Sequence, residues 1–533
     1  MKSKALPEEG RLTQATPADY ETALRHAGQG KFQYLLMAAV GLYYIACGFQ
    51  TLSISYLLPS AECDLQLTTH EKGYLNSSPF IGSLLGAPLW GKLADSWGRR
   101  SVIVTALFLD GVAGIISSFM QSLWPLVFFR LITGFTNLAA LSVCFPYIGE
   151  MHLSKYRSRA ICWMEIYGAL GIVLIPLVAW AIIPRPWMLG SHEIGFRYNS
   201  WRIFIAVATI PSLLCSLAVF FFPESPAFLL SRGKHDQALD AFQRIYHINS
   251  GKPKNSYPIK QLVVIDSIEE VELESEGKVQ KEEGITARLL TILNQMADLF
   301  RPPLLKNTMI GLCSLFSLQL GFFGFGMWFP ELFNRFEEFS IAYPDETATV
   351  CEVANMDFES LGTLARNSTP GDLNTTSDCL GDTIHTQVFI NTFAIGFTCI
   401  CNAILMGLFV ERIGRKRLIV TAMLLTAACG AGSYFVRSAI QNLLLSCFLQ
   451  AFNGTSFSVL SSVLIELFPT SLRGLAMTIL MNLSNVGSIV GNLMFGLLLD
   501  VDCAIPVFVS AGVMGFCGLL CFFLPNTKNF QMS

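Results

Sequence analysis

The stretch GKLADSWGRR, Gly91–Arg100, places one acid, three basic residues and two glycines between two long apolar segments. A second stretch, GLFVERIGRK, Gly407–Lys416, has a similar make-up in the second part of the chain. The two stretches begin 316 residues apart (407 − 91 = 316). We call them the first and the second charged loop. Their likeness indicates that the chain contains an internal duplication.

A second pair of motifs has the same spacing. Glu150 opens the stretch EMHLSKYRSRA, and Glu466 opens ELFPTSLRGLA, again 316 residues later (466 − 150 = 316). In each stretch an arginine, Arg157 or Arg473, follows seven residues after the acid. Two matches in one register predict two halves with equivalent loops.

The composition indicates an integral membrane protein. Of the 533 residues, 52% are hydrophobic and only 14% are charged, whereas a soluble domain has about 25% charged residues. The net charge of −3 gives no basic surface for nucleic acid. The 15 cysteines are scattered and show no metal-ligand spacing, so we expect neither a metal site nor a cofactor. The polar start of the chain lacks the apolar core of a cleaved signal peptide.

Stretches long and apolar enough to cross a bilayer, about 20 residues each, divide into two groups of six. We therefore predict an all-α membrane protein with twelve transmembrane helices in two pseudo-symmetric six-helix halves. The predicted spans are 33–58, 73–94, 101–121, 124–148, 160–183 and 202–222, then 306–330, 386–409, 418–436, 441–463, 474–498 and 504–524.

Basic residues are more frequent in one set of short loops, which predicts that both termini are cytosolic. The predicted parts are a cytosolic tail (1–32), an N-terminal six-helix half (33–222), a cytosolic linker (223–305), a C-terminal half (306–524) and a short tail (525–533). Within the linker, 231–249 is predicted to form a short amphipathic helix. The linker is also a possible docking surface for a cytosolic partner.

The segment 331–385 is predicted to be a polar outer loop within the C-terminal half. It contains acceptor sequons at Asn367 and Asn374, which predict glycosylation. It also contains Cys351 and Cys379, and an oxidising outer compartment would permit a disulfide between them.

Several motifs carry a resemblance to known families. GKLADSWGRR resembles the loop between the second and third helices of the major facilitator superfamily. PESPAFLL (223–230), ELFPTSLRG (466–474) and LPNTKNF (524–530) resemble sugar-porter signatures, the last with Asn526 where that branch has glutamate. YETALRHAGQGKFQYLL, LLPSAECDLQLTTHEKGYL, FPESPAFLLSRGKHDQAL and FFGFGMWFPELF are similar to the synaptic vesicle glycoprotein 2 family and its relatives. The resemblance implies a twelve-helix fold with a solute site near the midplane.

In such a fold, the charged loops are expected to form an inner gate that breaks when the inside opens. Asp95 can bond backbone N–H groups at a facing helix N-terminus, and Gly91 and Gly98 allow a tight turn. The alternative is a basic loop that only obeys the orientation rule. Arg99 and Arg100 are expected to pair with Glu150, and Arg415 and Lys416 with Glu466. The predicted gate residues are Gly91, Asp95, Gly98, Arg99, Arg100, Glu150 and Arg157, and Gly414, Arg415, Lys416, Glu466 and Arg473.

Ionisable and amide side chains inside spans are candidates for the solute path. Arg130 is either a cavity cation or part of a structural pair, and Asp110 has either a structural or a transport role. Glu165 faces the cavity or reaches the membrane surface. Asn76 lies in a sequon inside a span and is read as a packing or cavity residue. The predicted cavity residues are Gln50, Arg130, Trp163, Glu165, Phe322, Trp328, Asn391, Asn453, Asn482 and Asn485.

Three further positions depart from the family pattern. Related proteins carry an acidic pair in helix one where Cys47 and Gln50 stand here, which puts proton coupling through helix one in doubt. Ala227 replaces the usual arginine of PESPAFLL, which weakens the inner-gate network.

The expected function is secondary transport of a small organic solute by alternating access, as a uniporter or coupled to a gradient. No nucleophile constellation and no ATP-binding loop is present, so an enzyme is not expected. The alternative is a transporter-derived membrane protein that regulates vesicles, trafficking or partner binding. The protein is expected to be a monomer in the plasma membrane or an intracellular vesicle membrane.

Overall fold

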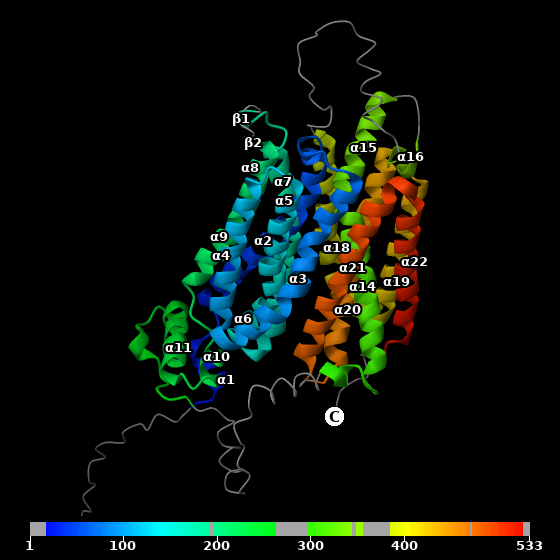
Figure 1. The fold of residues 1–533 in the computed structure, drawn as a ribbon. Coiled ribbons are helices and arrows are strands. Elements are labelled where there is room, and N and C mark those ends of the chain that lie inside the picture. Colours follow the sequence, from blue (N-terminus) through cyan, green and yellow to red (C-terminus); the bar gives the residue numbers. More distant parts are fainter. Residues whose placement is uncertain are drawn as a thin grey trace, which may run out of the picture.

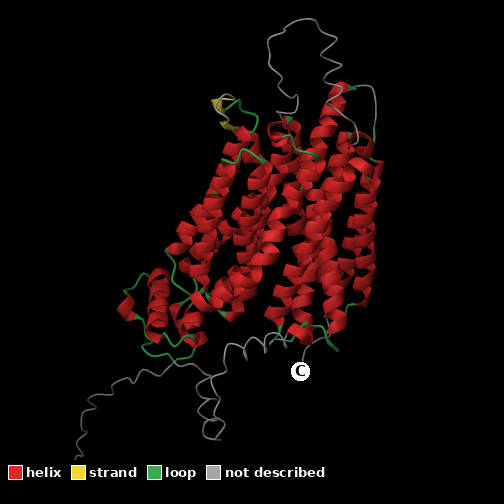
Figure 2. Ribbon diagram, viewed as in Figure 1, coloured by secondary structure: helices red, strands yellow, loops and turns green. Residues whose placement is uncertain are grey.

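The computed structural model describes residues 18–191, 196–262, 296–343, 348–354, 384–469 and 472–525. The described chain is a bundle of long helices with one short strand pair (Figures 1 and 2). That pair, β1 (Met188–Ser191) and β2 (Phe196–Asn199), is antiparallel and stands at one end of the bundle. The predicted all-α fold is confirmed in its essentials.

The first six spans form the N half. Its fourth span changes from α-helix to a π-helical turn and a short 3-10 turn before it continues, and its sixth is made of two consecutive helices. The helices are α2 (Lys31–Leu65), α3 (Thr69–Trp97), α4 (Arg99–Ser118), α5 (Leu123–Thr133) with η1 (Gly134–Leu138), η2 (Leu141–Val143) and α6 (Cys144–Glu150), α7 (Ser154–Ile182), and α8 (Ser200–Ala208) with α9 (Ile210–Phe220).

The last six spans form the C half. Its first span consists of two helices in succession. The helices are α14 (Leu305–Gly326) with α15 (Phe329–Ala342), α18 (Thr386–Ile413), α19 (Arg415–Gly432), α20 (Ala439–Leu467), α21 (Arg473–Asp502) and α22 (Ala504–Leu520). Short 3-10 turns follow α19 at Ser433–Phe435 and α22 at Cys521–Phe523, and another lies in the linker at Lys254–Ser256.

Eleven of the described helical stretches are long and apolar enough to span a membrane, and α3 is the exception. It contains Lys72, Pro79 and Pro88, and most of its small polar residues are buried. α3 packs against α21 of the C half on one face and against η1 of its own half on another. Because protein rather than lipid surrounds much of α3, its low hydropathy is tolerated, and it takes the place of the predicted second span.

The two halves lie side by side (Figure 1). Contacts between them include those of α3 with α21 and of α7 with α18. These are the second span with the eleventh and the fifth with the eighth, so the interface repeats the symmetry of the two halves. The duplication seen in the sequence is therefore also present in the packing.

Short helices pack under the N half at the end that carries the first charged loop. They are α1 (Tyr20–Ala27), α10 (Pro226–Ser231) and α11 (His235–Ser250), and α11 occupies the stretch predicted to be amphipathic. Asn249 of α11 accepts a hydrogen bond from the backbone N–H of Phe32 at 2.9 Å and donates one to the carbonyl of Gly28 at 2.8 Å. We call this end of the bundle the charged-loop end.

The opposite end corrects two predictions. The segment after 330 is not wholly a loop, because Phe329–Ala342 forms α15. Cys351, in α16 (Val350–Ala354), is bonded to Cys503 rather than to Cys379. α16 lies against the turn between α21 and α22, where Cys503 stands, so the predicted pairing was wrong. Asn367, Asn374 and Cys379 lie outside the described residues. We call this end the disulfide end.

Candidate functional site

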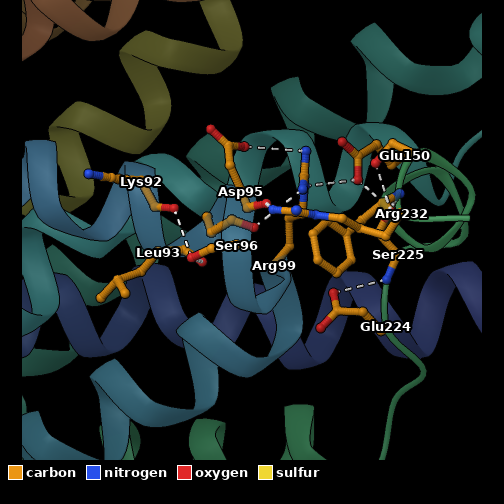
Figure 3. A network of polar contacts seen from close by, with 12 residues as sticks. Lys92, Leu93, Asp95, Ser96, Arg99, Glu150, Glu224, Ser225 and Arg232 are labelled. Carbon is orange, nitrogen blue, oxygen red and sulfur yellow. Dashed lines mark hydrogen bonds and ion pairs between the residues drawn. The ribbon is translucent and has the colours of Figure 1, made fainter. Parts of the chain in front are cut away.

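The first charged loop is the junction of α3 and α4 (Figure 3). Arg99 contacts the carboxylate of Glu150 at 3.3 Å, as predicted, and that of Asp95 at 3.7 Å. Gly98 makes the turn with φ +102°, and a Cβ there would clash with the carboxylate of Glu224. The turn therefore requires glycine at 98. Gly91 lies within α3 and makes no turn, so its predicted role was wrong.

The carboxylate that meets the N-terminus of α4 belongs to Glu224, not to Asp95. It accepts hydrogen bonds from the backbone N–H of Arg100 at 2.9 Å and of Ser101 at 3.3 Å. A negative charge at this position satisfies otherwise unpaired donors and favours the helix dipole. The side chain of Asp95 is 78% exposed, and Arg99 is its one ion-pair partner in the described part of the chain. Glu224 stood in the quoted PESPAFLL motif, but the sequence did not indicate which helix end it faces.

Three further arginines, in this loop or near it, donate hydrogen bonds to backbone carbonyls. Arg100 donates to the carbonyl of Phe220 and does not pair with Glu150 as predicted. Arg157 donates to Gly149 at 2.9 Å and so holds the end of α6. Arg232, five residues after Ala227, donates to the carbonyl of Asp95. A guanidinium is thus present near the loop although position 227 lacks one.

The second charged loop, like the first, combines a glycine turn with an arginine–glutamate pair, and fewer contacts are described for it. Gly414 makes the turn with φ +91°, and Arg415 pairs with Glu466. Among the described residues no ion pair joins Lys416 to Glu466, so the pairing was predicted correctly for Arg415 alone. The side chain of Arg473 lies outside the description. Each charged loop pairs within its own half, and its role as a gate stays a prediction.

The disulfide end contains a charged network that joins the two halves. Lys72 of α3 contacts Glu331 of α15 at 2.7 Å and Glu62 of α2 at 2.8 Å. Arg335 binds Glu331 at 2.9 Å and lies 3.9 Å from Asp500. Lys72 and Glu331 are fully buried. The sequence analysis missed this network because it assigned both of these residues to loops.

Further contacts between α3 and the C half extend from this network to the middle of α3. A Cβ on Gly73 would lie 2.9 Å from the Cα of Gly496, and the rings of Phe80 and Phe323 are 4.7 Å apart. A further contact is a hydrogen bond from the amide of Asn485 to Ser83 at 3.2 Å. The described bonds and ring contacts between α3 and the C half therefore lie in the part of α3 nearest the disulfide end.

Two predicted cavity residues meet in a buried polar cluster of the N half. Arg130 donates to the side-chain oxygen of Gln50 at 3.3 Å, and the amide of Gln50 donates to Asp110 at 3.2 Å. Asp110 also accepts hydrogen bonds from Asn137 at 2.8 Å and from Ser212 at 2.6 Å. We call these five residues the Asp110 cluster. The sequence identified three of its members but not their connection.

The other predicted cavity residues are scattered. Asn485 faces the N half, as described above. Trp328 stacks on Phe495, and Asn453 faces Met514, both within the C half. The remaining positions show no common site: Trp163 is half exposed, Phe322 and Asn482 are partly buried, Asn391 accepts a bond from Gln387, and the side chain of Glu165 lies outside the description.

Two six-helix halves that meet across a polar interface define a transporter fold of the membrane. The chain belongs to the Major Facilitator Superfamily, whose model matches residues 38–349 and 377–530. It is 26% identical to synaptic vesicle glycoprotein 2C of Rattus norvegicus, covering 99% of this chain and 82% of the relative. It is 25% identical to synaptic vesicle glycoprotein 2B of Homo sapiens, covering 96% and 86%.

Solved structures support the same fold. A partially occluded inward-open conformation of the xylose transporter XylE from E. coli matches with a TM-score of 0.65 at 18% identity, covering 94% of this chain and 99% of that chain. A D-xylose-proton symporter matches with a TM-score of 0.62 at 18% identity, covering 94% and 100%. The likeness establishes the architecture of this multi-pass membrane protein.

Proposed function

We propose that the protein is a secondary transporter that moves a small organic solute by alternating access. The observation that carries the proposal is the uneven junction of its halves. The described bonds between α3 and the C half run from Lys72, at the disulfide end, to Ser83 at the middle of α3, and the charged loops at the other end pair within their own halves. Halves joined at one end can rock about a central site.

Buried polar groups near the interface indicate the class of solute. Both amide atoms of Asn76 are buried without a partner among the described residues. Asn76 lies three residues after Gly73 and four before Phe80, on the face of α3 turned to the C half. On α21 the hydroxyl of Ser488 and the amide oxygen of Asn492 are also unpartnered. Such groups are costly to bury unless something bonds them, which favours an uncharged solute with hydroxyl or amide groups.

Short loops rich in lysine and arginine usually face the cytosol. The charged-loop end is therefore proposed to face the cytosol, with both termini on that side. The protein is proposed to lie in the plasma membrane or in an intracellular vesicle membrane. The names of the relatives, which refer to synaptic vesicles, support the vesicle membrane. We propose that the protein acts as a monomer, without nucleic acid, and that the linker 223–305 is available to a cytosolic partner.

The first test is solute-dependent thermal stabilisation of the purified full-length protein, followed by uptake into liposomes. The panel holds sugars, amino acids, organic cations and organic anions. A solute at 100 times its Kd stabilises the folded state by about 2.7 kcal/mol. We expect a neutral hydroxylated solute to raise the melting temperature of the wild type and the Asn402→Ala control, and Asn76→Ala to lose this effect.

Asn402→Ala is the control because it removes a span amide that already has a partner inside the C half, the carbonyl of Ala451 at 2.8 Å. Equal loss in both variants would point to general destabilisation and count against a site at Asn76. If the folded protein binds no solute and liposomes take none up, the transport proposal fails. The regulatory alternative would then take its place, and partner capture on 223–305 would follow.

A further inference from the structure

Asp110 is a buried carboxylate to which the proposed rocking of the two halves assigns no role. It lies midway along α4 and is fully buried. Its Oδ2 atom accepts all three hydrogen bonds of the cluster, from Gln50, Asn137 and Ser212. Its Oδ1 atom has no partner among the described residues. A carboxyl group inside a membrane span is costly when charged, which makes it a candidate for proton movement.

Arg130, the cation nearest to Asp110 in the cluster, is connected to it by the neutral side chain of Gln50. Gln50 accepts a bond from Arg130 with its oxygen and donates one to Asp110 with its nitrogen. Atoms Nε and Nη2 of Arg130 are unpartnered in the described structure. The acid and the base are therefore connected but not in direct contact, and each keeps polar atoms free for a second arrangement.

Among the residues that the structure describes, the groups around Asp110 offer no cation other than Arg130. The polar and titratable side chains that face its region from α2, α5 with η1, and α9 are Tyr43, Cys47, Gln50, Arg130, Asn137, Ser212 and Cys215. Of these, Arg130 alone carries a positive charge, and Tyr43 donates its hydroxyl to the carbonyl of Asn137. The charge of the cluster thus depends on whether Asp110 holds a proton.

The cluster is also connected to the interface of the halves. Asn137 belongs to η1, a π-helical turn, and such turns inside α-helices are frequent at functional sites. The carbonyl of Phe135 in the same turn accepts a hydrogen bond from the indole of Trp90 at 2.6 Å. Trp90 lies on α3, the helix that carries the contacts to the C half. A change at Asp110 therefore acts on η1, and η1 contacts the helix that must move.

We propose that Asp110 is the proton-binding residue that couples solute movement to a proton gradient, with Arg130 as its charge partner through Gln50. The proposal rests on the transport function proposed above and selects its gradient-coupled form. In the loading step, a hydronium ion on one side gives a proton that forms an O–H bond with the carboxylate at Oδ1, and a water molecule is left behind. In the release step that bond breaks, the proton passes to water on the other side, and the carboxylate is again compensated by Arg130. No oxidation or reduction is involved.

Proton binding can be measured without a known solute. Infrared difference spectra of the full-length protein, recorded while the pH is lowered in steps, report the carbonyl band of each protonating carboxyl group. Protein labelled with ¹³C in the aspartate carboxyl shifts the aspartate bands and separates them from glutamate. We expect a band from a buried aspartic acid in the wild type and in a Glu466→Gln control, and its loss in Asp110→Asn.

A second variant distinguishes a proton-binding site from a structural hydrogen-bonded group. Asn137→Ala removes one donor to the carboxylate and so favours its protonated form. We expect the midpoint of the band's pH titration to move upward by about one pH unit. An unchanged midpoint, or a band that persists in Asp110→Asn, overturns the proposal.

The labelled wild-type protein tests the proposal even if the Asp110→Asn variant does not fold. Absence of a buried aspartic acid band over the whole pH range in which the protein stays folded also overturns the proposal. This result is independent of solute transport: a protein that shows the band but moves no solute refutes the proposed function and leaves the proton site in place. A transporter without the band refutes the proton site alone.

Discussion

The two ends of the bundle use the same kinds of charged side chain under opposite conditions. At the disulfide end, Lys72 and Glu331 are buried and join the two halves. At the charged-loop end, the side chains of Arg415 and Glu466 are 38% and 45% exposed and join two helices of one half. An exposed pair contributes little, whereas removing one partner of a buried pair leaves an uncompensated charge. Burial, rather than the number of charges, therefore decides how much each pair contributes to holding its elements together.

The largest effect is expected from the buried network. Lys72→Glu or Glu331→Lys places like charges together in the interface, and each is expected to cost about 3–5 kcal/mol in the free energy of unfolding. The double exchange, Lys72→Glu with Glu331→Lys, should recover part of the loss because the pair is restored. The measurement is a double-mutant cycle on melting temperatures in detergent. No recovery in the exchanged protein would show that the two residues do not interact in solution.

The disulfide is expected to come next. Cys503→Ser opens a link that spans 152 residues, and loss of a disulfide typically costs about 2–5 kcal/mol. Non-reducing mass mapping of wild-type peptides should show Cys351 joined to Cys503. Cys429→Ser serves as the control, since that thiol is free. A peptide joining Cys351 to Cys379 would contradict the structure.

At the charged-loop end, the capping carboxylate should matter more than the pair. Glu224→Gln weakens the acceptor at the N-terminus of α4 and is expected to cost about 1–2 kcal/mol. Asp95→Asn is the matched control and should have almost no effect, because that side chain is exposed. The measurement is the melting temperature of each variant. Equal decreases in both variants would mean that Asp95 also caps the N-terminus of α4.

The smallest effect is expected at the second charged loop. Arg415→Gln removes one partner of an exposed pair and should cost less than about 1 kcal/mol. This loss should shrink further in high salt, which screens exposed charges. A loss as large as that in the Lys72 variants would end the contrast between the two ends.

Local patterns in the sequence were enough to predict the helices but not the pairings. Apolar runs and the repeated spacing of Gly91 and Gly407 predicted two halves of six spans, since these features depend on neighbouring residues. The partners of Lys72 and Cys351 lie 259 and 152 residues further along the chain. No local pattern specifies such pairs, and disulfide connectivity is not readable from cysteine positions alone.

The candidate site shows the same limit. Gln50 and Arg130 were predicted as individual polar residues within spans, and Asp110 was left between two roles. Their connection needs the relative rotation of three helices, which one sequence does not provide. Glu224 and Asp95 both stood near a helix end as acids. Only the turn at Gly98 determines which carboxylate meets the backbone of α4.

The low hydropathy of α3 has a consequence for biosynthesis. A helix with Lys72 near its start and two prolines in its body partitions weakly into lipid as an isolated segment. Its residues suit contact with other helices, many of which are made later than α3. Stable insertion of α3 is therefore expected to depend on helices from both halves, and truncated chains that end before α21 should leave this segment accessible to aqueous reagents.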